Sequence, residues 1–290
     1  MRIAVIDIGG TAIKSALYEN DKLHDRRETL SDGLKGGAHI MELAKSIVAD
    51  YQDFDAIGIS TAGQVDSRTG VIIFAGETIP NYTGFDVRRI FNEKFNVPVY
   101  VENDVNATAI GEAAFGAGKN HNDFLCLTYG TGIGGAIIRD GKVYTGSSYS
   151  AGEFGIIITH AERPLGEGIY EKFASATALI KNVNAEFAEI TNGRQVFMNI
   201  GDQKVKHIVD NWIHEILCGL TNLVHIFNPS LIIMGGGIME AEYIVPEVRK
   251  RLSNYVVPSM MNVEIQSAKL GNDAGLWGMV HRTTQELCPH

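Results

Sequence analysis

Several features that mark particular protein classes are scarce in this sequence of 290 residues. Its three cysteines, Cys126, Cys218 and Cys288, lie far apart and form no C-x-x-C pair, so neither a zinc knuckle nor a disulfide framework is expected. No run of about 18 apolar residues occurs, so no segment is expected to span a membrane. The net charge of −9 leaves no basic excess for a phosphate backbone, which argues against a nucleic-acid partner.

The remaining composition is typical of a soluble globular protein. Apolar residues make up 45% of the chain and charged residues 20%, which indicates a sizeable buried core. The chain opens with a strand-like segment at 2–7, without the basic region and apolar core of a signal peptide, so we expect a cytoplasmic protein. The acidic balance still permits a nucleotide, because a few local donors and a metal ion can hold a triphosphate.

Strand-like and helix-like segments alternate along the chain, which predicts an α/β fold. The opening plan of apolar strand, glycine turn, strand and polar turn returns from Asp123 onwards, which predicts two related lobes facing each other. Their expected bounds are 1–116 with the C-terminal helix 275–290 for the first lobe, and 117–274 for the second. Apolar residues at helical spacing predict further helices near 40–51, 86–95, 106–115, 170–188, 203–227 and 246–255.

Three glycine turns follow buried strands, at 9–10, 130–135 and 235–237. Such a turn lets backbone N–H groups approach a phosphate without a Cβ in the way, although one alone is explained by an ordinary tight turn. Asp7 precedes the first turn, and Thr11 and Lys14 follow it. The Asp7 carboxylate could hold a magnesium ion through water, while the Thr11 hydroxyl and the backbone amides bind phosphate oxygens. No G-x-x-x-x-G-K-[ST] segment occurs, and the second turn opens a hairpin where a Rossmann turn would open a helix.

Three carboxylates stand out beside these turns. Asn103 and Asp104 lie between a short strand and an alanine-rich helix, where they could converge on a ligand hydroxyl with Asp104 as its base. A helix cap at Asp104 or Asn106 explains the same residues equally well. Glu153 and Glu171 could accept hydrogen bonds from vicinal hydroxyls, although the helix dipole alone also explains Glu171.

The segments D-I-G-G-T-A-I-K, E-N-D-V-N-A-T-A-I-G-E, L-T-Y-G-T-G-I-G-G, A-G-E-F-G and I-M-G-G-G follow one another in this order. Together they resemble the ROK family (repressors, open reading frames, kinases) of sugar kinases, over the chain from its first strand to the final A-G-L-W-G. The resemblance implies two actin-like, ribonuclease-H-like α/β lobes with an interdomain cleft. It also implies an enzyme that uses ATP and Mg²⁺ to phosphorylate a small-molecule sugar. A homodimer is implied as well, because members of the family commonly dimerise.

The resemblance implies roles for individual residues. The phosphate and nucleotide contacts correspond to Asp7, Gly9, Gly10, Thr11, Lys14, Thr131, Gly132, Gly235, Gly236 and Gly237, with Asp7 near the magnesium ion. The sugar contacts correspond to Gly63, Asn81, Asn103, Asp104, Glu153 and Glu171. Asp104 would act as the general base.

The sequence departs from the family pattern where a histidine and a C-x-C-G-x-x-G-C cluster usually bind zinc. Ile156 stands at the histidine position, and the stretch 164–170 contains no cysteine, so no structural zinc is expected. We expect packing to hold this loop and interpret His160 as incidental, without partners. The lost histidine would lie near the anomeric side of the sugar, which leads to the hypothesis of a β-glucoside acceptor, or of free glucose bound with relaxed selectivity.

The implied reaction is transfer of the γ-phosphoryl group of ATP to the 6-hydroxyl of a hexose or β-glucoside. A non-catalytic ROK-type sugar sensor is the alternative, but it would lack the base or the phosphate turns. A ROK repressor would need a DNA-binding segment ahead of the first strand, where this acidic chain begins directly. An actin-like ATPase would not need Asn103, Glu153 and Glu171 as a set.

Overall fold

The computed structural model describes residues 1–187 and 189–288 and contains two compact units. The segment Thr145–Ala151, placed in the second lobe from the sequence, belongs to unit 1, where Ser150 Oγ donates to Gln64 Oε1 at 2.9 Å. Among the described residues, no helix has both the length and the apolar character needed to cross a membrane. Unit 1 comprises Met1–Phe115, Thr145–Ala151 and Asp273–His290, and unit 2 comprises Gly116–Tyr144 and Gly152–Asn272.

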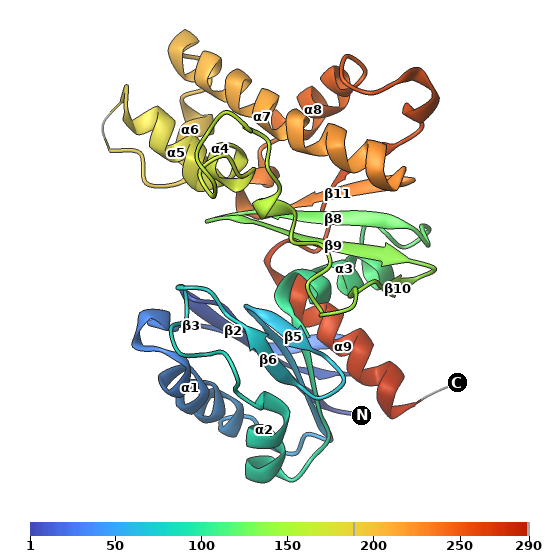
Figure 1. Cartoon of the computed structure of the whole chain (residues 1–290). Coiled ribbons are helices and arrows are strands. Elements are labelled where there is room, and N and C mark those ends of the chain that lie inside the picture. Colours follow the sequence, from blue (N-terminus) through green and yellow to red (C-terminus); the bar gives the residue numbers. More distant parts are fainter. Residues whose placement is uncertain (188, 289–290) are drawn as a thin grey trace. The chain divides into compact units, whose positions relative to one another are not determined.

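Unit 1 is built on a five-stranded sheet with the order β3-β2-β1-β4-β7. Figure 1 labels its neighbouring strands β2 and β3. The central strand β1 pairs antiparallel with β2 and parallel with β4, and β4 pairs parallel with β7. The carboxyl ends of β1, β4 and β7 therefore lie at one edge of the sheet. The strands are β1 (Ile3–Ile8), β2 (Ala12–Glu19), β3 (Lys22–Leu30), β4 (Ala56–Thr61) and β7 (Val99–Asn103).

Helices cover both faces of this sheet because the side chains of β1 alternate between two cores. Ile6 and Ile8 pack with α1 (Gly37–Ala49) and α2 (Val87–Phe95), whereas Ile3 and Val5 pack with α3 (Asp104–Phe115) and α9 (Ala274–Leu287). A hairpin that the sequence did not predict, β5 (Gln64–Asp66) with β6 (Val71–Phe74), completes the unit.

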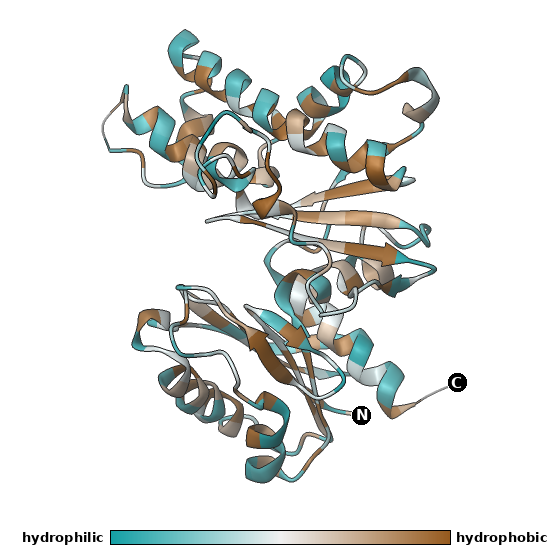
Figure 2. Cartoon of the chain, viewed as in Figure 1, coloured by the Kyte–Doolittle hydropathy of each residue, from teal (hydrophilic) through white to brown (hydrophobic). Residues whose placement is uncertain are grey.

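Unit 2 repeats the plan with a five-stranded sheet of order β10-β9-β8-β11-β12, which confirms the internal repeat. The three inner strands β8, β9 and β11 are predominantly hydrophobic, whereas the helix α7 has one hydrophobic and one hydrophilic face (Figure 2). The strands are β8 (Phe124–Tyr129), β9 (Ile133–Arg139), β10 (Lys142–Val143), β11 (Leu231–Gly235) and β12 (Glu264–Ser267). The helices are α4 (Glu171–Ala174), α5 (Ala176–Asn184), α6 (Gly193–Met198), α7 (Gln203–Phe227) and α8 (Ile244–Leu252).

The single helix predicted over 170–188 is wrong. The chain breaks at Ser175, which is extended with φ −71° and ψ 163° and separates α4 from α5. Its Oγ accepts a hydrogen bond from Ala178 N at 3.1 Å and so begins a new helix. The last residue of the predicted helix, at 188, lies outside the described residues.

We predict that Gly278→Ala lowers the free energy of unfolding by about 1–3 kcal/mol, the usual cost of overpacking. A Cβ at this position in α9 would lie 1.8 Å from the carbonyl oxygen of Ala107 in α3. Urea unfolding measures the change, and Gly201→Ala is the control because a Cβ there would have no neighbour within 4 Å. Equal stabilities for the two variants would contradict the close packing of α3 on α9.

Candidate active-site residues

Asp7 lies near the carboxyl end of β1, in parallel register with Ser60 of β4. Ser60 Oγ donates a hydrogen bond to Asp7 Oδ1 at 2.6 Å, and a Cβ added at Gly275 of α9 would lie 3.3 Å from Asp7 Cγ. Burial raises the pKa of the Asp7 carboxyl, while the Ser60 hydroxyl and the charge of Lys14 act in the opposite direction. Asp7 is therefore fixed in place by its neighbours on two strands and a helix.

Asn103 and Asp104 occupy the junction between β7 and α3. Asn103 Oδ1 accepts hydrogen bonds from the backbone N–H groups of Val105 and Asn106, each at 3.0 Å, so Asn103 caps the helix. Its Nδ2 donates to Asp104 Oδ1 and to Gly63 O, both at 2.9 Å. Val105 N also donates to Asp104 Oδ1 at 2.9 Å, so Asp104 takes part in bonding the first turn of the helix, whereas Asn106 lies within α3 and does not cap it. Asn103 thus caps the helix and orients Asp104.

The pKa of Asp104 lies well above the ordinary value of an aspartate. Burial, and after it the negative charge of Asp7, raise the pKa of Asp104 to about 7. Hydrogen bonds from Val105 and Asn103 act in the opposite direction. A carboxyl group with a pKa near neutral is suited to accept a proton from a hydroxyl group.

The first glycine turn joins β1 to β2 next to Asp7. Gly9 N donates to Ala12 O at 3.0 Å, and Gly10 O accepts from Gly33 N at 3.0 Å, so the turn is closed by backbone hydrogen bonds. Thr11 is exposed beyond it. Lys14 lies on β2 directly opposite Asp7 in the antiparallel register, so the predicted phosphate residues of unit 1 are brought together.

Gly63 and Asn81 both have left-handed backbone conformations, with φ of 98° and 55°. Gly63 joins the Asn103 hydrogen-bond network through its carbonyl oxygen, and a Cβ there would lie 2.9 Å from Phe74 O. Asn81 is exposed on the loop before α2, and its neighbour Tyr82 is buried with its hydroxyl 3.0 Å from Thr61 Oγ1. The loop is thus anchored by Tyr82 while Asn81 faces outward.

In unit 2 the second glycine turn contacts Glu171. Glu171 Oε2 accepts a hydrogen bond from Ile133 N at 3.2 Å. A Cβ added at Gly132 would lie 2.5 Å from this oxygen, and one at Gly155 would lie 2.8 Å from it. The carboxylate therefore reaches into the glycine turn, which the helix dipole alone does not explain.

The third glycine turn lies beside the second. Gly236 has φ 96°, and a Cβ there would lie 2.3 Å from the carbonyl oxygen of Tyr129, the residue before the second turn. Gly235 ends β11 in parallel register with Thr128 of β8. Thr131 and Gly237 are both exposed at these turns. The structure therefore brings the predicted phosphate residues of unit 2 to one edge of its sheet.

Glu153 is exposed and precedes the 3₁₀ helix Phe154–Ile156. Gly152, with φ 94°, holds this segment against β9, because a Cβ there would lie 2.6 Å from Gly135 O. Gly155 of the same segment packs against Glu171, so the two predicted sugar-binding carboxylates belong to neighbouring segments of unit 2. Ile156 is 57% exposed.

The interpretation of His160 as a residue without partners is wrong. Its ring stacks on Phe173 with centroids 3.8 Å apart, and its Nε2 lies 3.5 Å from Glu215 Oε2. Backbone pairing also holds the loop, since Gly168 O accepts from the N–H groups of Thr159 and His160. Within the described part of the chain, no group of three or more histidine, cysteine, aspartate or glutamate side chains is arranged to hold a metal ion.

Two site residues were missed by the sequence analysis. Ser60 lies near the carboxyl end of β4 and meets Asp7 only through the parallel register of β1 and β4. Glu102 is the first residue of the segment E-N-D-V-N-A-T-A-I-G-E and received no role, although its Oε1 accepts a hydrogen bond from Asn103 N at 3.0 Å. The register of adjacent parallel strands would have been the signal for Ser60.

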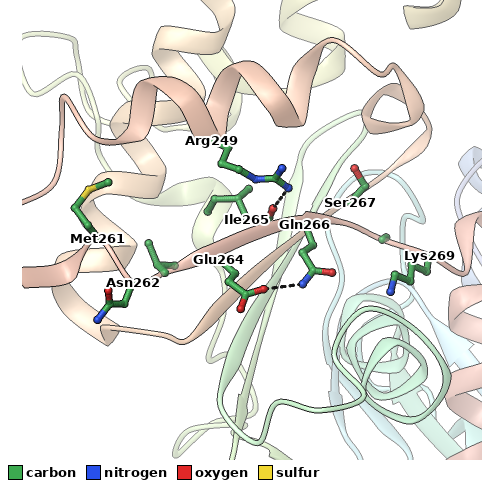
Figure 3. A pocket seen from close by; sticks show the side chains of 10 residues that line it. Arg249, Met261, Asn262, Glu264, Ile265, Gln266, Ser267 and Lys269 are labelled. Carbon is green, nitrogen blue, oxygen red and sulfur yellow. Dashed lines mark hydrogen bonds between the residues drawn. The ribbon is translucent and has the colours of Figure 1, made fainter.

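A separate groove of about 680 Å³ runs along the edge strand β12 of unit 2 (Figure 3). Its polar groups bond among themselves: Gln266 Nε2 donates to Glu264 Oε2 at 2.9 Å, and an Nη of Arg249 donates to Ile265 O at 2.6 Å. None of its lining residues is among the predicted site residues. The groove is therefore not part of the candidate site.

We predict that Asp104→Asn changes stability in a pH-dependent way. Because the folded-state pKa is raised to about 7, the wild type loses stability as pH rises through the interval between the unfolded value and 7, and the variant does not. The variant should therefore gain on the wild type by about 3 kcal/mol between about pH 4.5 and about pH 8, at 1.36 kcal/mol per pKa unit. Urea unfolding across this range measures the difference, and a pH-independent difference would contradict the raised pKa.

The chain is similar to known proteins over nearly its whole length. The ROK family model matches residues 3–286. A β-glucoside kinase of Listeria monocytogenes is 30% identical over 300 residues, with 100% of each chain covered. The structure of a ROK family glucokinase from Streptomyces griseus in complex with glucose and AMPPNP has a TM-score of 0.86 at 28% identity, covering 98% of this chain and 100% of that one.

A xylose repressor of Bacillus spizizenii is 31% identical over 230 residues, which cover 77% of this chain and 59% of the repressor. The likeness to solved ROK kinases also shows that the two α/β units have the actin-like fold expected from the sequence. With a family match from the first strand to the last helix, this chain belongs to the ROK family.

Proposed function

We propose that this protein is an ATP-dependent sugar kinase that transfers the γ-phosphoryl group to the 6-hydroxyl of a hexose or β-glucoside. The observation that carries the proposal is Asp104, a carboxyl group with a pKa of about 7 held by Asn103 at the carboxyl end of β7. The names of the relatives, a β-glucoside kinase and a glucokinase solved with glucose and AMPPNP, support the choice of sugar and nucleotide.

In this proposal Asp104 accepts the proton of the sugar hydroxyl as its oxygen attacks the γ-phosphorus of ATP and ADP leaves. Gly63, Asn81, Asn103, Glu153 and Glu171 bind the sugar hydroxyls. The glycine turns at 9–10, 130–132 and 235–237 offer backbone N–H groups to the phosphates and the nucleotide, together with Thr11, Lys14 and Thr131. Phosphoryl transfer depends on such positioning and charge stabilisation more than on covalent chemistry.

The carboxylates of unit 1 fit a magnesium ion, because Mg²⁺ prefers oxygen ligands and the charge of Asp7 acts on Asp104. Asp7 would hold the ion through water, and the bound ion would supply positive charge that neutralises the phosphates.

The sugar specificity is proposed from Ile156, which stands where the family usually has a histidine near the anomeric side. With 57% of Ile156 exposed, this position offers an apolar surface and no hydrogen-bond donor. Such a surface accommodates a substituent on the anomeric oxygen better than a polar contact to a free hydroxyl would. We therefore include β-glucosides among the acceptors.

A sugar-binding regulator is the second candidate, favoured by the identity with the xylose repressor. A regulator would bind sugar without needing a base. The raised pKa of Asp104 and the hydrogen bond that it accepts from Asn103 Nδ2 favour the kinase. ADP formation that depends on sugar distinguishes the two functions.

Asp104→Ala should lower kcat by about 10²- to 10⁴-fold, the usual effect of losing a general base, and weaken sugar binding less. A coupled assay for ADP measures kcat and KM. The control is Asp86→Ala, which removes a helix cap in the same unit, where Asp86 accepts from Arg89 N at 2.9 Å. Near-normal turnover by the Asp104 variant would show that another group accepts the proton.

Ile156→His should lower kcat/KM for cellobiose relative to glucose, because an imidazole restores a polar contact and fills space at the anomeric side. Ile158→His is a matched control, since Ile158 is also 57% exposed on the following stretch of unit 2. Initial rates with both sugars measure the ratio. A wild type that strongly prefers glucose over cellobiose would remove β-glucosides from the proposal.

A further inference from the structure

Glu102, the residue before Asn103, is a buried carboxylate that the reaction itself does not use. It is only 1% exposed, and its Oε1 accepts hydrogen bonds from Asn103 N at 3.0 Å and from Asn106 Nδ2 at 3.1 Å. Its Oε2 accepts a hydrogen bond from Nη1 of Arg282 in α9. One side chain therefore ties the strand end, the first turn of α3 and the C-terminal helix together.

Arg282 lies on the face of α9 that contacts the catalytic region of unit 1. Gly275, Gly278 and Arg282 follow one another at intervals of three and four residues, which places them on one side of the helix. Gly275 packs against Asp7, Gly278 packs against α3, and Arg282 reaches Glu102. The same helix face thus touches the neighbourhoods of both carboxylates.

The free energy of unfolding does not by itself explain why an ion pair is buried between Glu102 and Arg282. Burial lowers the pKa of the Arg282 guanidinium, which reflects the loss of its hydration. An apolar pair of similar volume often serves stability equally well, whereas charged hydrogen bonds are short and directional. Orientation of the groups bonded to Glu102 is what the pair specifically provides.

We propose that Arg282 is a positioning residue that, through Glu102, fixes the orientation of Asn103 and Asp104. The inference rests on the proposed function, in which Asp104 must meet the proton of a sugar hydroxyl. Asn103 transmits the constraint, because its N–H is bonded to Glu102 while its Nδ2 holds Asp104 and Gly63 O. A misplacement of about 1 Å can cost on the order of a hundredfold in rate.

The test uses the double variant Glu102→Gln with Arg282→Met, because either change that left one buried charge unpaired could unfold the protein. The glutamine keeps an acceptor for Asn103 N and Asn106 Nδ2 while the ion pair is removed. We expect kcat to fall about 10- to 100-fold, with a smaller change in the KM for sugar and little change in melting temperature. Arg282→Lys, which keeps the charge opposite Glu102, should retain more activity than the double variant.

Arg88→Met is the matched control. Arg88 and Arg282 both donate to Ser67 O, at 3.0 and 3.4 Å, but the second hydrogen bond of Arg88 goes to the backbone of Arg68. Its kcat should stay within about twofold of the wild type. A double variant that is folded and keeps normal kcat would overturn the positioning role while leaving the kinase proposal intact.

A wild type without sugar phosphorylation would instead overturn the kinase proposal. The positioning role is then decided by a crystal structure of the double variant. We expect the contact from Asn103 Nδ2 to Gly63 O, 2.9 Å in the wild type, to lengthen beyond hydrogen-bond distance. An unchanged contact and an unchanged Asp104 side chain would overturn the inference.

Discussion

The burial of two carboxyl groups, Asp7 and Asp104, at the carboxyl ends of parallel strands is the constraint on which unit 1 depends. Burial raises the pKa of both groups, and the charge of Asp7 adds to the effect on Asp104. Such groups are costly unless neighbours hold them, and here Ser60 and Asn103 donate to them. The cost is understandable if the site exists to take up a proton and positive charge during a reaction.

Much of the surrounding architecture keeps these groups in place. The parallel register aligns Ser60 with Asp7, and the turn from β7 into α3 uses Asn103 both as helix cap and as the partner of Asp104. Helix α9 closes against this region through glycine residues that allow close approach. In unit 2, Glu171 likewise depends on glycine, because it reaches into a turn that has no room for a further side chain.

The sequence predicted the α/β class, the internal repeat and most elements, because buried strands and amphipathic helices have strong periodic signals. The break at Ser175 escaped it, since the apolar pattern continues across a residue whose side chain starts a second helix. The sequence also did not predict that the Asn103 side chain bonds both Asp104 and the first turn of α3, or that His160 has contacts of its own. These contacts join residues distant in sequence or depend on side-chain direction, which spacing does not reveal.

The family resemblance named the site residues, but the physical reasons for them come from the structure. Asp104 differs from an ordinary helix cap because Asn103 Oδ1 binds the N–H groups of Val105 and Asn106, while burial and the charge of Asp7 raise the pKa of Asp104 to about 7. Phosphorus NMR of the wild-type protein with ATP, Mg²⁺ and glucose or cellobiose shows whether the γ-phosphoryl group reaches a sugar. We expect a new phosphate-ester signal from a 6-phosphorylated sugar together with ADP, whereas no ADP, or ADP with inorganic phosphate regardless of sugar, would show that the protein is not a sugar kinase.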